Sequence, residues 1–277
     1  MPEGPEIRLE ADQIAGVLER ETIERVELTI PELKPYAGRL RDARVVRVYP
    51  RGKAMLVELD SGFTIYSHNQ LYGRWVTRRK GKLPQTNRQL RLALYTAKGV
   101  AALYSASDVD ILTSNELLAH PFLSKLGPDV LDEKTTAALL ADRLTKKAFR
   151  NRTLGSLFLD QNFLAGVGNY LRTEILFNAE LHPKCRPADL TAAQKASLAK
   201  VCLKICQRAY KTRGVVNAPT RVAALRAQGL KRSDYRFAVF GREDHPCYVC
   251  GTNIQRIAVT SRRLYLCPTC QPECVRL

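Results

Sequence analysis

The two ends of the chain carry a possible reactive amine and a possible metal site. Met1 is followed by Pro2 and Glu3. A small residue after an initiator methionine favours its removal, so we expect Pro2 to carry a free secondary amine. An N-terminal amine has a pKa of about 7.7–8.0, against about 10.4 for lysine, so about a tenth of it is neutral at pH 7. Such an amine can attack an aldehyde carbon and form a Schiff base, and Glu3 could move the protons.

Four cysteines near the other end have the spacing of metal ligands. They form two Cys-x2-Cys pairs, Cys247 with Cys250 and Cys267 with Cys270. Each pair can place two sulfur ligands on one tight knuckle, and two knuckles complete a tetrahedral zinc site. Four cysteines leave no open position for a substrate, so the spacing predicts one structural Zn²⁺ in a zinc ribbon. Cys274 lies close enough in sequence to compete as a ligand.

The charge of the chain favours a polyanionic partner. Its 277 residues include 44 Lys and Arg against 27 Asp and Glu, a formal net charge of +17. Residues 201–277 hold 14 basic and 4 acidic residues and so carry +10. An imbalance of this size points to DNA, RNA or an anionic membrane surface; a generally basic protein is the alternative. No apolar run has the length of a membrane span and no signal peptide is recognisable, so we expect a cytoplasmic protein.

A polar and aromatic run follows one of the predicted strands. Residues 67–73 read Ser-His-Asn-Gln-Leu-Tyr-Gly, which predicts a loop that presents Gln70, Leu71 and Tyr72. Loops of this kind can wedge into a duplex from which a base has been extruded. A strand end with half-buried Leu71 and Tyr72 is the alternative.

Three further stretches could contact phosphates. Residues 166–170 (Gly-Val-Gly-Asn-Tyr) predict the turn of a helix-turn-helix, where Asn169 at the next helix start can donate to a phosphate; a simple helix cap is the alternative. Residues 51–53 (Arg-Gly-Lys) are predicted to begin a strand and read by themselves as a solvated basic pair. Arg262 and Arg263 are expected near the turn of the ribbon.

The apolar periodicity predicts the elements that position these residues. A helix is expected over residues 5–20, which places Pro2 and Glu3 just ahead of a helix N-terminus. Short β-type runs between 23 and 110, with a hairpin turn at 60–62, predict an antiparallel sandwich or barrel. Gly-Pro at 127–128 indicates a hinge or linker.

Beyond that linker the chain is predicted to be helical. We expect a helix over 135–144, two helical segments within 153–180, and a third helix capped by Thr191 that runs through 210. Cys202 and Cys206 lie in this third helix and are expected to be core residues. Residues 212–235 have no clear period and predict a flexible loop. The fold class is α+β: an N-terminal antiparallel β-sandwich with flanking helices (1–126), a linker (127–133), a helical domain (134–235) and a zinc ribbon (236–277).

Together these motifs resemble the formamidopyrimidine-DNA glycosylase/endonuclease VIII family. The resemblance covers nearly the whole chain and rests on residues 2–6, 51–53 and 160–170 and on the cysteine quartet. The stretches 66–73, 103–108, 120–123 and 127–131 are more similar to endonuclease VIII. The resemblance implies a helix-two-turn-helix in the helical domain, damaged double-stranded DNA as the partner, and a monomer.

The resemblance also implies a mechanism. Pro2 attacks C1′ of the damaged nucleotide, and Glu3 shuttles protons as the sugar opens. Lys53 assists β-elimination and contacts phosphate, and Arg262 clamps DNA and supports δ-elimination. Glu6 supports the site through the first helix.

The residues implied to contact DNA are Gln70, Leu71, Tyr72, Lys125 and Asn169. Lys125 stands where related enzymes often carry arginine, and so lacks bidentate geometry. The resemblance to endonuclease VIII implies oxidised pyrimidines as substrates. Oxidised purines such as 8-oxoguanine or formamidopyrimidines are the alternative, and a zinc-ribbon DNA-binding protein without catalysis is a third possibility.

Overall fold

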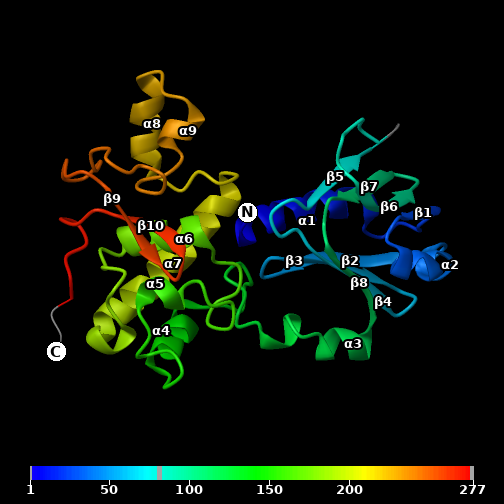
Figure 1. Ribbon diagram of the computed structural model, residues 1–277, viewed down its shortest axis with the longest axis horizontal. Coiled ribbons are helices and arrows are strands. Elements are labelled where there is room, and N and C mark those ends of the chain that lie inside the picture. The colour runs from blue at the N-terminus through cyan, green and yellow to red at the C-terminus, as the bar shows by residue number, and fades with distance from the viewer. Residues whose placement is uncertain (1, 80–82, 275–277) are drawn as a thin grey trace. The chain divides into compact units, whose positions relative to one another are not determined.

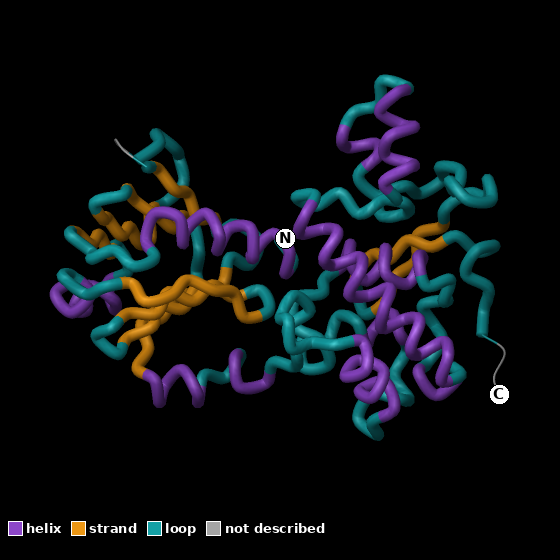
Figure 2. Tube along the Cα trace, turned by 180° about the vertical axis from the view of Figure 1, so that it is seen from behind, coloured by secondary structure: helices purple, strands orange, loops and turns teal. Residues whose placement is uncertain are grey.

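The computed structural model describes residues 2–79 and 83–274 of the chain. It divides into two compact units, Met1–Lys125 and Leu126–Leu277 (Figure 1). Within the described part of the chain, no helix is both long and apolar enough to cross a membrane. Two four-stranded sheets belong to the first unit, and the second is mainly helical (Figure 2).

The first unit holds strands β1–β8 and the helices around them. Its elements are α1 (Gly4–Leu18), β1 (Arg25–Leu28), η1 (Pro31–Tyr36), α2 (Ala37–Leu40), β2 (Val45–Arg51), β3 (Ala54–Leu59), β4 (Phe63–His68), β5 (Arg74–Arg78), β6 (Leu90–Thr96), β7 (Gly99–Tyr104), β8 (Asp108–Thr113), α3 (Ser114–Ala119) and η2 (Leu123–Lys125).

The strands of this unit form two antiparallel sheets that share one core. Their orders are β1-β6-β7-β5 and β2-β3-β4-β8. One face of α1, including Ile7, Ile14 and Leu18, is buried in that core with residues from both sheets. The predicted β-sandwich with flanking helices is therefore confirmed.

The turns between β2, β3 and β4 refine the prediction. Gly62 closes the predicted hairpin between β3 and β4 with φ of 84°. Residues 51–53 do not begin a strand: Arg51 ends β2, Gly52 turns the chain with φ of 61°, and β3 begins at Ala54. A glycine adopts this left-handed conformation without the steric penalty of a Cβ, so the tripeptide makes the hairpin turn itself.

The second unit is built from helices and one two-stranded hairpin. Its elements are α4 (Ala137–Thr145), α5 (Leu154–Leu157), α6 (Asn169–Asn178), η3 (Pro187–Asp189), α7 (Ala192–Lys211), α8 (Pro219–Ala227), α9 (Arg232–Tyr235), β9 (Gln255–Val259) and β10 (Arg262–Leu266).

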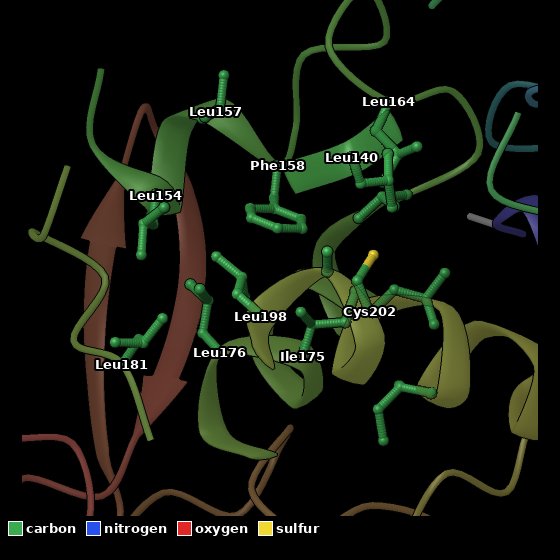
Figure 3. Close-up of a cluster of buried hydrophobic side chains, with 14 of the residues drawn as sticks. Leu140, Leu154, Leu157, Phe158, Leu164, Ile175, Leu176, Leu181, Leu198 and Cys202 are labelled. Carbon is green, nitrogen blue, oxygen red and sulfur yellow. The ribbon is translucent and has the colours of Figure 1, made fainter. Parts of the chain in front are cut away.

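The core of the second unit lies between α4, α5, α6 and α7 (Figure 3). Phe158, Ile175 and Leu198 are buried in it, and each such side chain contributes about 1.5–3 kcal/mol relative to an exposed one. Cys202 lies in this core as predicted, and so does Cys206. The predicted cap of α7 is confirmed, because the Thr191 side chain accepts a hydrogen bond from the Gln194 N–H. The predicted helix start at Asn169 is confirmed as the start of α6. The first of the two helical segments predicted within 153–180 is only the single turn α5.

The flexible loop predicted over 212–235 is wrong, since this segment contains α8 and α9. Pro219 stands at the start of α8, where its missing N–H costs no hydrogen bond. Leu225 is buried, and Asp234 caps the start of α9 by accepting the Lys231 N–H at 3.0 Å. A helix of nine residues with a weak apolar face escapes detection by periodicity, because one buried leucine does not make a repeat.

The segment 127–133 is packed against the glycine-containing loop before α6. The Gly127 N–H donates to the Gln161 carbonyl at 2.9 Å, and the Ala165 N–H donates to the Pro128 carbonyl at 2.9 Å. A Cβ on Gly127 would stand 2.1 Å from the Asn162 carbonyl oxygen. The predicted linker is therefore held along its first residues.

Cys274 is not a competing metal ligand, because it forms a disulfide with Cys185. The two cysteines are 89 residues apart in sequence, so no local pattern pairs them. The same tail is held by the buried Gln271 amide, which donates to the Leu181 carbonyl at 2.9 Å, and by an ion pair between Lys184 and Glu273 at 2.9 Å. The disulfide thus secures the chain beyond the last pair of cysteines.

Candidate active site and zinc centre

Pro2 and Glu3 lie at the start of α1, as predicted. Glu3 is the N-cap residue and only 4% exposed, and Pro2 is half-buried. The Glu6 carboxylate accepts the Glu3 backbone N–H at 3.1 Å. Glu6 therefore satisfies a backbone donor that the helix leaves unpaired, and it fixes the direction in which the chain enters the helix. This gives the supporting role predicted for Glu6 a local structural basis.

Lys53 follows the β2–β3 turn and is buried to 8% exposure. Ala54 pairs with His68 across β3 and β4, and the charge of Lys53 is felt at the His68 ring. Burial is the main cause that lowers the pKa of His68, and Lys53 lowers it further while Asp108 opposes both. A neutral His68 can therefore act as a hydrogen-bond acceptor at neutral pH.

The loop after β4 presents Leu71 and Tyr72 to solvent, with exposed fractions of 64% and 71%. This confirms the predicted loop and removes the alternative of a half-buried strand end. Gln70 has φ of 47°, its N–H donates to His68 Nδ1 at 3.1 Å, and its side-chain oxygen accepts from Ser107 at 3.0 Å. Two apolar side chains are thus exposed on a backbone that is held in one conformation.

Glu10 on α1 braces this loop from behind, a role that sequence reasoning missed. Its carboxylate accepts the Asn69 amide at 2.7 Å and the Trp75 backbone N–H at 3.2 Å. Burial raises the pKa of Glu10, against the opposing effect of these hydrogen bonds. Gly73 closes the loop so tightly that a Cβ would lie 2.6 Å from the Asn69 backbone. The only signal in the sequence was a carboxylate on the apolar side of the first helix.

A buried arginine organises the second group of candidate residues. Arg172 is fully buried in α6 and donates to the Asn169 side-chain oxygen at 2.6 Å. It also donates to the carbonyls of Gly155 at 2.8 Å and Arg263 at 3.1 Å. Because the Asn169 oxygen is occupied, its amide N–H groups are left to donate. Arg172 thereby joins the predicted phosphate contact at α6 to the strand that carries Arg262.

Arg262 and Arg263 are exposed at the tip of the β9–β10 hairpin, as predicted. Thr260 and Ser261 make the turn with φ of 50° and 63°, the pair of positive values found in a tight hairpin. Lys125 is also exposed, at the end of η2 in the first unit.

Glu174, two residues after Arg172 in α6, holds the segment that leads into the cysteine quartet. Its fully buried carboxylate accepts three consecutive backbone N–H groups, those of Ala238, Val239 and Phe240, at 2.9–3.0 Å. Burial raises the pKa of Glu174 and the three hydrogen bonds act against it. Such a carboxylate fixes three residues of irregular backbone at once.

The four predicted metal ligands come together as one cluster. The sulfur atoms of Cys247, Cys250, Cys267 and Cys270 all lie within 4.8 Å of one another. The Cys247–Cys270 and Cys250–Cys267 sulfur separations are 3.9 and 3.4 Å. Zn–S bonds of about 2.3 Å in a tetrahedron require sulfur separations of about 3.8 Å. The donor set and its spacing therefore fit Zn²⁺.

Comparison with known proteins agrees with this geometry. Models of the formamidopyrimidine-DNA glycosylase N-terminal domain, of its H2TH domain and of the zinc finger found in FPG and IleRS match residues 1–106, 126–218 and 244–272. Endonuclease 8 of Klebsiella pneumoniae subsp. pneumoniae is 45% identical over 271 residues, which cover 98% of this chain and 100% of that protein. The chain belongs to the formamidopyrimidine-DNA glycosylase/endonuclease VIII family. Endonuclease 8 of Escherichia coli (strain K12 / DH10B) is 44% identical with the same coverage.

The family membership settles the class of enzyme. Members of the formamidopyrimidine-DNA glycosylase/endonuclease VIII family are DNA glycosylases with AP lyase activity in base-excision repair, and this chain is one of them. Its fold is that of Lactococcus lactis formamidopyrimidine-DNA glycosylase, solved in non-covalent complex with DNA that contains an AP site. The TM-score is 0.78 at 20% identity, over 98% of this chain and 100% of that one.

Proposed function

We propose that this enzyme removes oxidised pyrimidines from duplex DNA through a Schiff base on Pro2 and then cuts the strand by β,δ-elimination. The observation that carries the proposal is the start of α1. There Pro2 is followed by a buried Glu3, whose backbone is fixed by Glu6, in a chain that matches endonuclease 8 over its whole length at 45% identity.

The first half of the reaction uses these two residues. The Pro2 nitrogen, after removal of Met1, forms a bond to C1′ of the damaged nucleotide, and the bond from C1′ to the base breaks as the base leaves with a proton. Glu3 gives a proton to the sugar ring oxygen, so that the ring opens and an iminium remains on Pro2. A buried carboxyl at this point can hold and return that proton.

The second half cuts the strand on both sides of the opened sugar. Loss of a proton from C2′ breaks the C3′–O bond, and we assign assistance in this step to Lys53. A further elimination breaks the C5′–O bond, for which Arg262 holds the phosphate. Hydrolysis of the iminium releases Pro2 and leaves a one-nucleotide gap with phosphate ends.

DNA is held by two groups of residues. Gln70, Leu71 and Tyr72 fill the space that the extruded base leaves, for which two exposed apolar side chains on a braced loop are suited. Asn169 donates its amide to a phosphate, since Arg172 occupies its oxygen. Lys125 adds a point charge to the DNA-binding surface.

Borohydride trapping of the untagged protein tests the proposal. It uses one duplex with thymine glycol and one with 8-oxoguanine opposite cytosine. The expected result is an adduct that maps to Pro2 and forms mainly on thymine glycol. An adduct mainly on 8-oxoguanine would move the substrate to oxidised purines and keep the chemistry. Tight DNA binding without any adduct would refute the Schiff base. Pro2→Gly is the control, expected to bind DNA but to lose most trapping.

We also propose that the cysteine quartet holds one structural Zn²⁺, which when bound ties the two knuckles together. Cys250→Ser should lose the metal and weaken DNA binding, while Cys202→Ser, which removes a thiol outside the quartet, should keep the metal. Metal content measured by atomic absorption decides between the two results. Full zinc content in Cys250→Ser would refute the ligand assignment.

A further inference from the structure

The segment 211–236 of the second unit is strongly basic. It contains seven Lys and Arg and a single acidic residue, Asp234. Its helices α8 and α9 pack on each other and project from the rest of that unit (Figure 1). We call α8, α9 and their connection the α8–α9 hairpin. None of the residues to which a catalytic, DNA-binding or metal-binding role is assigned above lies in it.

The hairpin and the end of α7 enclose a pocket of about 410 Å³. Three arginines line it, Arg208, Arg226 and Arg232, and the described lining residues include no carboxylate. Pro219, Val222 and Tyr235 supply apolar and aromatic surface. A cavity of this size with positive and apolar walls suits a ligand that combines an anion with a flat apolar body.

The arginines keep donors for such a ligand. Arg208 donates one N–H to the Val216 carbonyl at 2.9 Å, and Arg232 donates one to the Arg213 carbonyl. A guanidinium has five donors, so each retains others. Arg226 is exposed and makes no ion pair within the described part of the chain. The Glu174 carboxylate offsets part of the charge of Arg208, and an anion between Arg226 and Arg232 would reduce the repulsion between their charges.

We propose that this pocket binds a nucleoside monophosphate unit, with its phosphate on Arg226 and Arg232 and its sugar and base against Tyr235 and Pro219. The proposal rests on the proposed function only in taking the unit from a DNA strand. Contacts that link the pocket to the phosphate contact at Asn169 support that source. The Arg236 guanidinium donates to the Gly214 carbonyl at 2.8 Å and lies 5.7 Å from the Tyr170 ring centroid, and Tyr170 directly follows the phosphate contact Asn169.

The first zinc knuckle holds the hairpin in place. Tyr248, between the ligands Cys247 and Cys250, donates its hydroxyl to the Asp234 carbonyl at 3.2 Å. Its ring lies 5.3 Å from Arg221 of α8 and 3.4 Å from Arg242. The knuckle that carries Cys247 and Cys250 therefore contacts both α8 and α9, which form a wall of the pocket. A preordered wall loses less conformational entropy when it binds a ligand.

The test is the salt dependence of binding to undamaged duplex and to duplex with a stable abasic-site analogue. Removing one phosphate contact reduces the slope of log K against log salt by about 0.9. We expect R226A/R232A to show that reduction on both duplexes, and the control K200A/K204A, which removes two exposed charges from α7, to show less of it. Thermal melts of both variants verify folding.

A second measurement distinguishes the two sources of the nucleotide. Titration of the protein with free dTMP, followed by NMR, is compared between wild type and R226A/R232A. An unchanged salt slope together with dTMP binding that only the wild type shows would assign the pocket to free nucleotides. An unchanged slope and no difference with dTMP would overturn the proposal. Borohydride trapping of the wild type reports on Pro2 separately, so a failure there leaves this result interpretable.

Discussion

Arg172 offers the sharpest test of how the second unit is assembled. Arg172→Met keeps most of the side-chain volume and removes the hydrogen bonds from the guanidinium to Gly155, Asn169 and Arg263. The bond to Gly155 is buried, and leaving a buried acceptor unpaired costs about 1–3 kcal/mol. The bonds to Asn169 and Arg263 are partly buried and contribute about 0.5–1.5 kcal/mol each. We therefore expect a loss of about 2–6 kcal/mol in the free energy of unfolding.

Urea unfolding of the zinc-loaded protein measures this loss. Arg172→Lys should lower the free energy of unfolding by less, since an ammonium can retain one or two of the hydrogen bonds. It cannot reproduce the planar set of donors of a guanidinium. Lys200→Met, on the exposed side of α7, is the control and should change stability by less than about 0.5 kcal/mol. Arg172→Met should also weaken binding to an abasic-site analogue under conditions where it is folded, because the Asn169 amide is no longer oriented. Stability and binding both equal to wild type would refute the role given to Arg172.

Three further outcomes follow from other contacts. Gly73→Ala should cost about 1–3 kcal/mol and reduce strand cleavage, because its Cβ meets backbone at 2.6 Å; Gly16→Ala, where a Cβ has open space, is the control. Cys274→Ser should lower stability in non-reducing buffer by up to about 4–5 kcal/mol, since it opens a loop of 89 residues, and reductant should bring the wild type to the same value; a midpoint insensitive to both would contradict the cross-link. Burial lowers the pKa of His68 below 6.5. The unfolded state therefore takes up a proton at a higher pH than the folded state, and the stability due to neutral His68, present above about pH 6.5, is lost as the pH falls below that value. His68→Asn should flatten this part of the profile of stability against pH, and an identical profile in both proteins would exclude His68 as the cause.

Local chemistry made the ends of the chain predictable. Two Cys-x2-Cys pairs give a four-cysteine cluster that fits zinc where the fold brings the knuckles together, because the spacing itself shapes each knuckle. The exposed loop at Gln70–Tyr72 and the helix start at Asn169 were also predictable, since a glycine and a polar run mark them locally. The β-sandwich followed from the period of the apolar residues, which is a property of each strand.

Contacts between distant residues could not be read in this way. Glu10 meets Asn69 across 59 positions, and Arg172 meets the Arg263 carbonyl across 91. Neither pair has a spacing rule, because the partners lie on elements whose packing depends on the whole core. The helices of 212–235 were missed for a related reason, as α8 is stabilised by its contacts with α9 and Tyr248 more than by its own apolar period.

The groups that could react and those that could bind a metal were recognisable from the sequence, because amine, carboxylate and thiolate chemistry belongs to the residue and its immediate neighbours. The way in which these groups are held depends on the packing of the whole fold. In the folded chain Cys274 forms a disulfide, and Glu10 and Arg172 hold distant segments through hydrogen bonds. The basic segment 211–236 forms a pocket with the end of α7. The physical reason is that burial and hydrogen-bond partners depend on long-range packing, which no short stretch of sequence specifies.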